Sequence, residues 1–284
     1  MSNGEKDLFR SLLEDIKKKR ELASLGEDFV IDRIREYIKE NPKILHKKLD
    51  TKIKKSREYR GLVKDIRRKL RIIYGIYYFD VDKGRQLLDR LKLVMDVNDE
   101  DVLNTYSDLL SLHPSTEERM DKYPLVYKRI FDVTGKPNSI LDLGSGLNPL
   151  SYIFMGLEKV DYVATELTKK EVDFLNDYFK IMGKYGLNGK AMKIDLLQLE
   201  NYKKLNNVDV CFMFKLLESL EFVERDISKK IIKLIPAKYI VVSFSTKSLS
   251  GVAIRKKGRK WFRALVKDFK AFNVGNELFY VIKK

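Results

Sequence analysis

The sequence predicts an α/β protein in which an all-helical amino-terminal region precedes a mainly parallel β-sheet. Up to residue 112, apolar residues recur at the spacing of amphipathic helices. After His113, short runs rich in β-branched and aromatic residues alternate with helical stretches. Such alternation is typical of parallel strands joined by helices. We therefore predict a helical domain over residues 1–112 and a sheet domain over residues 113–284.

Apolar periodicity places the helices of the first domain. Leu8, Leu12 and Ile16 share one helical face, and residues 29–38 provide a second one. Asn41-Pro42 ends this pattern, because proline disfavours a helical conformation in the residue before it. The remaining predicted helices span about 56–74, which is strongly basic, 83–95 and 100–112.

Seven β-rich runs predict the sheet. The first five alternate with helices, so we expect parallel strands with right-handed crossovers. Gly275-Asn276 separates the last two runs and is a hairpin turn signal, which adds an antiparallel strand. The predicted strands are 139–143, 162–166, 191–194, 208–214 and 239–244, followed by the pair 271–274 and 278–282.

The net charge of +16 is concentrated in two segments. Residues 43–71 carry a net +10 and residues 255–270 a net +7, so the rest of the chain sums to −1. Charge gathered in this way favours two contact surfaces for a polyanion over a generally lysine-rich, solvated surface. The candidate phosphate contacts are Lys52, Lys54, Lys55, Arg57, Arg60, Lys64, Arg67 and Arg68, then Lys247, Arg255, Lys256, Lys257, Arg259, Lys260 and Arg263.

The composition argues against several classes of protein. One cysteine and two histidines are incompatible with a disulfide framework and with a structural zinc site. The sequence has no apolar run of membrane-spanning length, and its first residues are polar. We expect a metal-free, cytoplasmic monomer without a membrane segment.

A glycine-rich turn after the first predicted strand is the strongest sign of a ligand site. Asp142 ends the strand, and Gly144 and Gly146 allow a ligand to lie against the backbone. Glu166 ends the next strand, 22 residues after Gly144, which is the spacing at which a carboxylate reaches ribose hydroxyls. Asp195 follows the third strand, where an acidic side chain meets the adenine amino group.

This turn favours S-adenosylmethionine over a dinucleotide. A dinucleotide site has a third glycine beside the pyrophosphate, and Pro149 stands at that position. Adenosylmethionine carries no phosphate and needs acidic groups for its ribose, amine and adenine. The alternatives are a nicotinamide-linked oxidoreductase and a fold in which Asp142 and Glu166 are ordinary residues of strand-end turns.

Four stretches resemble the aminoglycoside-resistance 16S rRNA guanine-N7 methyltransferases, the Arm and FmrO-like family. Residues 113–119 (HPSTEER) resemble its H-x-S-T-x-E-R segment, and residues 142–150 (DLGSGLNPL) match its Asn-Pro version of the glycine turn. Residues 214–218 (FKLLE) match the segment after the fourth strand, and residues 241–249 (VVSFSTKSL) resemble V-V-S-F-P-T-R-S-L. The resemblance covers most of residues 113–284; the helical third is similar only in arrangement and charge.

The resemblance implies a Rossmann-like class I methyltransferase sheet with a helical extension that docks onto the 30S subunit. It also implies methyl transfer from S-adenosylmethionine, which becomes S-adenosylhomocysteine, to N7 of a guanine in the decoding-site helix of 16S rRNA. Arg119 would approach the cofactor carboxylate, Glu166 the ribose, and Asp195 and Leu196 the adenine, while Lys215 would stand where the base enters. The further residues implied at the cofactor are Asp142, Gly144, Gly146, Asn148, Pro149, Leu167 and Phe214.

Two departures from the family pattern leave the target nucleotide open. Ser245 and Lys247 replace the usual proline and arginine, and lysine lacks the planar fork of arginine. Glu166-Leu167-Thr168 replaces a run that contains aspartate but keeps the carboxylate. The alternatives are a methyltransferase for tRNA or another rRNA site, and an inactive RNA-binding homologue. Abundant Lys and Glu with little Gln and Cys fit a thermophilic or archaeal member with a housekeeping role rather than drug resistance.

The residues available for chemistry also favour guanine N7. Carbon-5 methylation of cytosine needs a cysteine nucleophile, and Cys211 lies inside an apolar strand, where we expect it to be buried. Guanine N7 already holds a lone pair and needs no general base. The base would be flipped from its stack onto Phe214, Phe244 or Trp261, although each is more often a core residue. We expect His113 to order the turn at Ser115 rather than carry protons.

Overall fold

The computed structural model describes residues 3–42, 53–75, 78–247, 253–254 and 259–284. Contacts divide the chain into two compact units, Met1–Tyr78 and Phe79–Lys284. Among the residues described, no helix has the length and apolar character needed to cross a lipid bilayer.

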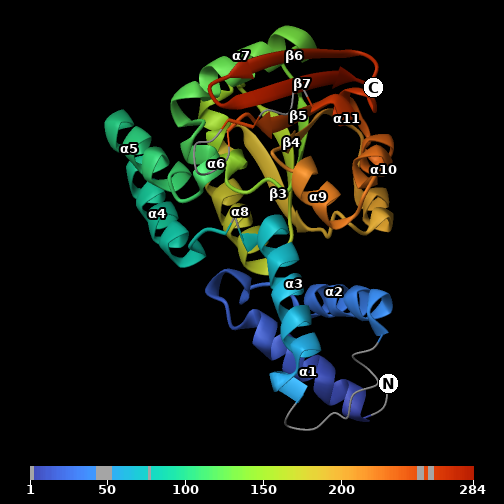
Figure 1. Ribbon diagram of the computed structural model, residues 1–284. Helices are drawn as coiled ribbons and strands as arrows, with labels where there is room; N and C mark the ends of the chain where they lie inside the picture. Colours follow the sequence, from blue (N-terminus) through green and yellow to red (C-terminus); the bar gives the residue numbers. More distant parts are fainter. Residues whose placement is uncertain (1–2, 43–52, 76–77, 248–252, 255–258) are drawn as a thin grey trace. The chain divides into compact units, whose positions relative to one another are not determined.

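In the described part of the first unit, the α-helices are α1 (Asn3–Lys17), α2 (Glu27–Glu40) and α3 (Arg57–Ile73), which contact one another (Figure 1). The predicted apolar faces form its core, since Leu12, Ile16 and Ile34 are fully buried. Ser56 caps α3 by accepting a hydrogen bond from the Tyr59 N–H at 3.2 Å. The basic helix predicted from the sequence is confirmed.

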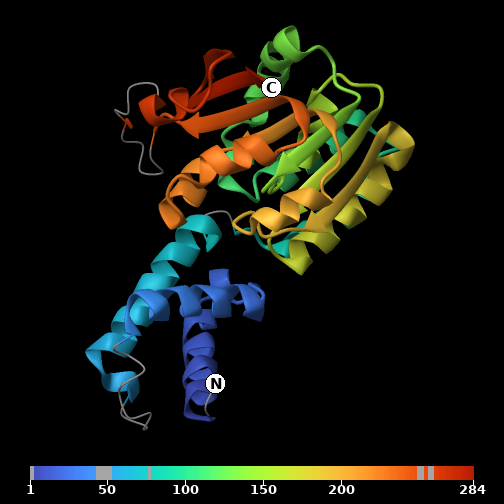
Figure 2. The ribbon, with the colours of Figure 1, turned by 90° about the vertical axis from the view of Figure 1, so that its right-hand side faces the viewer.

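The second unit is built on a seven-stranded sheet of order β3-β2-β1-β4-β5-β7-β6 (Figure 2). The first five strands are parallel, and the β6–β7 hairpin adds an antiparallel edge, as predicted. Because β1 lies between β2 and β4, the chain reverses its direction across the sheet at β1, where α/β proteins place ligands. The strands are β1 (Ser139–Leu143), β2 (Val160–Glu166), β3 (Leu187–Lys193), β4 (Val208–Phe214), β5 (Ala237–Ser245), β6 (Phe269–Val274) and β7 (Glu277–Lys283).

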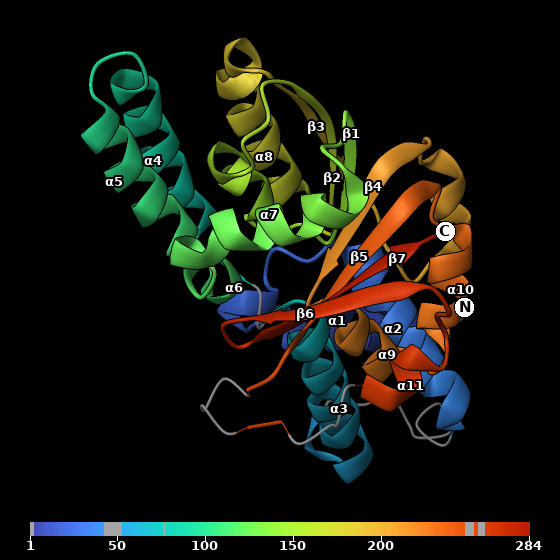
Figure 3. The ribbon, with the colours of Figure 1, turned by 90° about the horizontal axis from the view of Figure 1, so that it is seen from above.

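The boundary between the compact units differs from the predicted domain boundary at residue 112. Helices α4 (Val81–Val94) and α5 (Asp99–Leu110) form a pair that lies beside α8 (Lys169–Met182) of the sheet unit (Figure 3). The Phe79 ring meets Phe174 edge-on at 5.3 Å, and Tyr106 meets Tyr178 at 6.5 Å. The change from helical to strand periodicity near residue 112 therefore does not mark the boundary between the two hydrophobic cores, which lies near Tyr78.

The remaining helices either precede β1 or connect the strands. Helix α7 (Tyr123–Thr134) contacts the short helix η6 (Asn148–Phe154) and the β6–β7 hairpin, whereas α8 contacts β2 and β3. The shorter helices are α6 (Pro114–Glu117), α9 (Leu217–Val223), α10 (Ile227–Leu234) and α11 (Lys260–Arg263).

Candidate active site

The glycine turn after β1 is hydrogen-bonded to the end of β2. Gly144 and Gly146 both adopt positive φ angles, of 58° and 53°, which L side chains rarely adopt. The Gly144 N–H donates to Thr165 Oγ1 at 3.1 Å, and the Ser145 N–H donates to the Thr165 carbonyl at 3.1 Å. The backbone of the turn is thus held at the carboxyl edge of the sheet.

Glu166 is joined directly to this turn. Its carboxylate accepts a hydrogen bond from the Gly146 N–H at 2.5 Å and a longer one from Ser145 Oγ at 3.4 Å. Burial and the nearby charge of Glu171 raise the pKa of Glu166. The carboxylate that the spacing predicts at the ribose of a ligand therefore lies beside the glycine turn, and its contact with a ribose stays a prediction.

Asp195 lies on the adjacent strand end. The Ile194 N–H donates to the Glu166 carbonyl at 2.9 Å, which places Asp195 one residue beyond the end of β2. Asp195 Oδ1 accepts a hydrogen bond from the Leu197 N–H at 2.9 Å, and the Leu196 carbonyl accepts one from the Tyr202 hydroxyl at 3.1 Å. Glu166 and Asp195 are both partly exposed, so two carboxylates border the glycine turn.

Asn148 connects Asp142 to a group of buried tyrosines. Its Nδ2 donates to Asp142 Oδ2 at 2.9 Å, and the Tyr162 hydroxyl donates to the same oxygen at 2.6 Å. Its Oδ1 accepts from Arg119 Nη1 and from the Tyr123 and Tyr127 hydroxyls at 3.3–3.4 Å. Asp142, Asn148 and Pro149 are buried. These predicted cofactor residues therefore pack beneath the glycine turn, on its protein side.

Asp142 should leave a signature in the pH dependence of stability. Burial raises its pKa to about 6 from 3.8, so the folded chain holds this proton more tightly than the unfolded chain. The resulting stability is fully present below the ordinary pKa and is lost as the pH rises through about 6. Asp142→Asn is therefore expected to flatten the stability profile by on the order of 3 kcal/mol over this window.

Urea unfolding of the wild type and Asp142→Asn, at several pH values between about 4 and 7, measures this difference. Parallel profiles for the two proteins would show that Asp142 titrates normally.

A row of alternating charges lies at the carboxyl ends of β4 and β5. Arg119 Nε donates to Glu277 Oε2 at 2.8 Å, and Lys215 Nζ lies 3.8 Å from the same oxygen and 2.5 Å from Glu118 Oε2. Ser243 Oγ donates to Glu277 Oε1. Burial opposes the charge of Arg119, but the adjacent Glu277 carboxylate raises its pKa. Arg119 is buried and pairs with Glu277, so it does not form a surface ion pair with its neighbours Glu117 and Glu118.

Glu277 was not among the residues predicted from the sequence. A signal was available, because β7 runs antiparallel to β5, so the residue after the Gly275-Asn276 turn lies at the carboxyl edge of the parallel strands. Ser245 and Glu277 are paired in the register. An acid at this position points to the same edge as Glu166. A cavity of about 240 Å³ borders the charged row and is lined by Glu118, Arg119, Lys122, Val126, Val274, Asn276 and Glu277.

The aromatic candidates for base stacking are largely core residues. Phe214 is buried, stacks on Phe212 at 4.9 Å and lies under Arg119 at 5.0 Å. Phe244 is buried against Phe262, whereas Trp261 is partly exposed. Lys215, next to Phe214, has a positive φ of 54°.

Two further expectations about single residues are confirmed. Cys211 is fully buried, and burial raises the pKa of its thiol well above the usual value. His113 caps α6, its Nδ1 accepting a hydrogen bond from the Ser115 N–H at 3.2 Å.

The predicted phosphate contacts fall into three groups. Lys52, Arg255, Lys256 and Lys257 lie outside the described residues. Arg259 is a correction: only 3% of it is exposed, and it pairs with Glu218, so it faces the interior. The exposed ones are Lys54, Lys55, Arg57, Arg60, Lys64, Arg68, Lys247, Lys260 and Arg263, with Arg67 half-buried.

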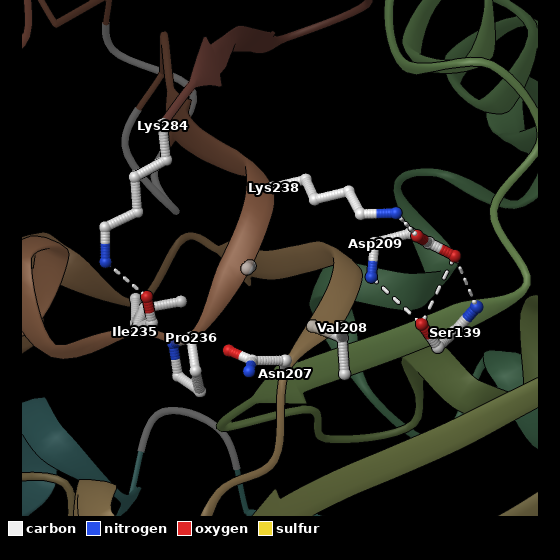
Figure 4. Close-up of a pocket in the computed structure, with 9 residues that line it drawn as sticks. Ser139, Asn207, Val208, Asp209, Ile235, Pro236, Lys238 and Lys284 are labelled. Atoms are coloured by element: carbon white, nitrogen blue, oxygen red, sulfur yellow. Dashed lines mark hydrogen bonds and ion pairs between the residues drawn. The ribbon is translucent and has the colours of Figure 1, made fainter.

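A second hollow, of about 700 Å³, opens at the amino ends of β1, β4 and β5 (Figure 4). Lys238 Nζ pairs with Asp209 at 2.7 Å, and Lys284 Nζ donates to the carbonyls of Lys233 and Ile235. Its cations thus bind the protein itself, and it contains none of the predicted ligand residues. The carboxyl edge remains the candidate active site.

The carboxyl edge fits S-adenosylmethionine. A partly exposed backbone bend at two glycines can lie against a nucleoside, and the two partly exposed carboxylates, Glu166 and Asp195, suit hydroxyl and amine donors. The bend is followed by the seven-residue 3-10 helix η6, whose second residue is Pro149. This is a less suitable support for a pyrophosphate than a long α-helix.

Comparison with known proteins identifies the family. The model of the family "Ribosomal RNA methyltransferase (FmrO)" matches residues 33–270. The 16S rRNA (guanine(1405)-N(7))-methyltransferase of Micromonospora rosea is 30% identical over 236 residues, which cover 78% of this chain and 82% of the relative. The relative of the same name from Proteus mirabilis is 28% identical over 243 residues, covering 78% and 84%.

A solved structure shares the fold over the whole chain. The crystal structure of 16S rRNA methyltransferase RmtF in complex with S-adenosyl-L-homocysteine has a TM-score of 0.77 and 23% sequence identity, covering 100% of this chain and 99% of that one. The family match and the sequence relatives lead to one assignment: the chain belongs to the FmrO family of ribosomal RNA methyltransferases.

Proposed function

We propose that this protein transfers the methyl group of S-adenosylmethionine to N7 of a guanine in the decoding-site helix of 16S rRNA, within the small ribosomal subunit. The observation that carries the proposal is the hydrogen bond that the Glu166 carboxylate accepts from the Gly146 N–H at the carboxyl edge of the sheet. A member of an rRNA methyltransferase family thus has an acid and a glycine bend where a nucleoside cofactor binds.

The cofactor supplies an electrophilic methyl group on a sulfonium. Glu166 would accept hydrogen bonds from the ribose hydroxyls, and Asp195 and Leu196 would border the adenine. Arg119 lies at the methionine end, oriented by Glu277, Tyr123 and Asn148.

Guanine N7 would form its bond to the methyl carbon with its own lone pair while the methyl–sulfur bond breaks and its electrons stay on the sulfur of S-adenosylhomocysteine. The protein therefore need not remove a proton. Its contribution is to hold the two reactants in line, and well-aligned reactants reach effective molarities on the order of 10⁵ M or more. Lys215 stands beside the acceptor, where its ammonium can donate to guanine O6, whereas the adenine amino group at that position would repel it.

The exposed cations of α3 and the segment before it are proposed to hold rRNA phosphates. Reversing Lys54, Arg57, Lys64 and Arg68 to glutamate is expected to abolish binding to the small subunit while the affinity for S-adenosylmethionine is kept. For every phosphate that the variant no longer neutralises, the salt dependence of RNA binding should fall by about 0.7–0.9 in log–log slope.

Filter binding to 30S subunits at several salt concentrations and calorimetry with S-adenosylmethionine test this prediction. The matched control reverses Lys128, Lys169 and Lys180, which are exposed on α7 and α8. An equal reduction of 30S affinity in the two variants would indicate a general effect of charge. Unchanged 30S affinity in the variant with reversed α3 charges would rule out α3 as the docking surface.

The proposed activity is tested by incubating the protein with labelled S-adenosylmethionine and separated 30S subunits, 50S subunits or tRNA. Borohydride reduction followed by aniline then cleaves RNA at N7-methylguanine, because the cationic base is labile. Label and cleavage confined to 30S subunits are expected. Label in tRNA or 50S subunits, or label without cleavage, contradicts the proposal.

A further inference from the structure

Arg259 is a basic residue whose guanidinium binds other parts of the same chain. Its Nη2 donates to Glu218 Oε2 at 3.0 Å and to the Ser245 carbonyl at 2.7 Å, and its guanidinium lies 5.3 Å from the centre of the Phe244 ring. A side chain in this arrangement cannot also reach a phosphate on the surface.

The backbone of Arg259 supports a structural constraint. Its φ is 48°, in the left-handed region that non-glycine residues rarely adopt. The other non-glycine residues with positive φ, in the part of the chain that is described, are Lys215 and Asp226. Conformations of this kind persist where surrounding contacts fix them, and they gather at functional sites.

The contacts of Arg259 join three pieces of chain at the acceptor side. Glu218 is the second residue of α9 and lies three residues after Lys215, whereas Ser245 ends β5. Ser245 Oγ donates to the Lys247 carbonyl at 2.5 Å, and the Thr246 N–H donates to the Asn276 carbonyl at 2.7 Å, next to Glu277. Arg259 therefore connects the segment of Lys215 to the segment of Lys247.

We propose that the Arg259–Glu218 ion pair is a positioning latch, which fixes the exposed Lys247 in register with Lys215 so that both meet the same RNA. The inference rests on the proposed function and deepens it. Arg259 acts through Lys247 and Lys215, and it touches neither RNA nor cofactor.

Substitution of Glu218 distinguishes a latch from a direct phosphate contact of Arg259, because the two roles predict opposite changes in RNA affinity. If Arg259 bound phosphate, Glu218→Ala would release the guanidinium and add one positive charge, so RNA affinity would rise or stay the same. If Arg259 is a latch, Glu218→Ala lets Lys247 move relative to Lys215, so RNA affinity falls despite the added charge.

The experiment measures the Kd for 30S subunits, the KM and kcat of methyl transfer, and the Kd for S-adenosylmethionine. Glu218→Ala, Arg259→Gln and the double variant are each expected to weaken RNA binding at least about threefold and raise KM correspondingly. The expected change in kcat and in cofactor affinity is less than about twofold. The double variant should be no weaker than the worse single variant, because both remove one interaction.

Two controls separate the latch from charge and folding effects. Glu158→Ala, an exposed acid at the amino end of the sheet, adds the same charge and should not weaken binding. Arg225→Gln removes an arginine whose side chain is 94% exposed. Retained cofactor affinity indicates a folded sheet unit, and Glu218→Gln should show the same direction with a smaller effect.

Tighter or unchanged RNA binding by Glu218→Ala, or additive effects in the double variant, would overturn the latch. Wild-type protein that binds 30S subunits without methylating them would refute the proposed function, while the binding constants of the variants still decide the latch.

Discussion

Glu277→Leu is expected to lower the free energy of unfolding of the sheet unit by about 3–5 kcal/mol. The substitution leaves the Arg119 guanidinium, which is 4% exposed, without the carboxylate that compensates its burial. Ser243 loses its acceptor at the same time, and Lys215 loses the more distant of its two carboxylates while it keeps Glu118. This cost far exceeds that of an exposed ion pair.

Fluorescence-monitored urea unfolding measures this effect in the sheet unit, because the single tryptophan of the chain, Trp261, lies in α11. Asp173→Ala is the matched control; it breaks the exposed Lys169–Asp173 pair and should cost about 1 kcal/mol or less. Adding Arg119→Met to Glu277→Leu should recover part of the stability by removing the unpaired charge. Equal, small destabilisation in both single variants would show that the pair is not effectively buried.

Glu166→Ala is expected to weaken S-adenosylmethionine binding by about 10- to 100-fold, as hydrogen bonds to a charged group contribute about 1.5–3 kcal/mol. The weakening has a second cause, because the Gly146 N–H loses its acceptor and the glycine turn loses one of its attachments to β2. Burial raises the pKa of Glu166 to about 8. The affinity of the wild-type protein for S-adenosylmethionine should therefore also increase as the pH rises through about 8, because the carboxyl group then becomes charged.

Calorimetry at several pH values tests both effects. Asp161→Asn is the matched control, because Asp161 lies on the same strand at its other end and bonds to Asn188 at 2.7 Å. Glu166→Gln should bind the cofactor without the pH dependence. Full affinity in Glu166→Ala would remove Glu166 from the cofactor site.

The sheet was predictable because its strands are encoded locally. β1 and β4 match the predicted runs residue for residue, since both are apolar and central. β3 was predicted four residues too late, because its first half is polar and contains Gly189. A Cβ at Gly189 would lie 2.0 Å from the Phe179 ring, so the glycine there reflects close packing by α8 rather than a break in the strand.

The candidate site was predictable only in part. Glu166 and the glycine turn follow a fixed spacing, so the sequence located them. Asn148 was noticed as a motif residue, but its partners come from α6–α7 and β2, which only the fold brings together. Arg259 looked like one of several surface cations, and nothing in its neighbourhood along the chain indicates Glu218, 41 residues away.

The pairing of α4 and α5 with α8 determines where this protein can be divided. Cutting the chain after Tyr78 leaves the rings of Phe174 and Tyr178 covered by Phe79 and Tyr106. A cut after residue 112 would instead strip a layer of aromatic side chains from the sheet unit and expose their partners to water, a surface that promotes aggregation. The smallest fragment that keeps the core of the sheet unit therefore begins near Phe79, inside the stretch that the sequence predicts as a purely helical domain.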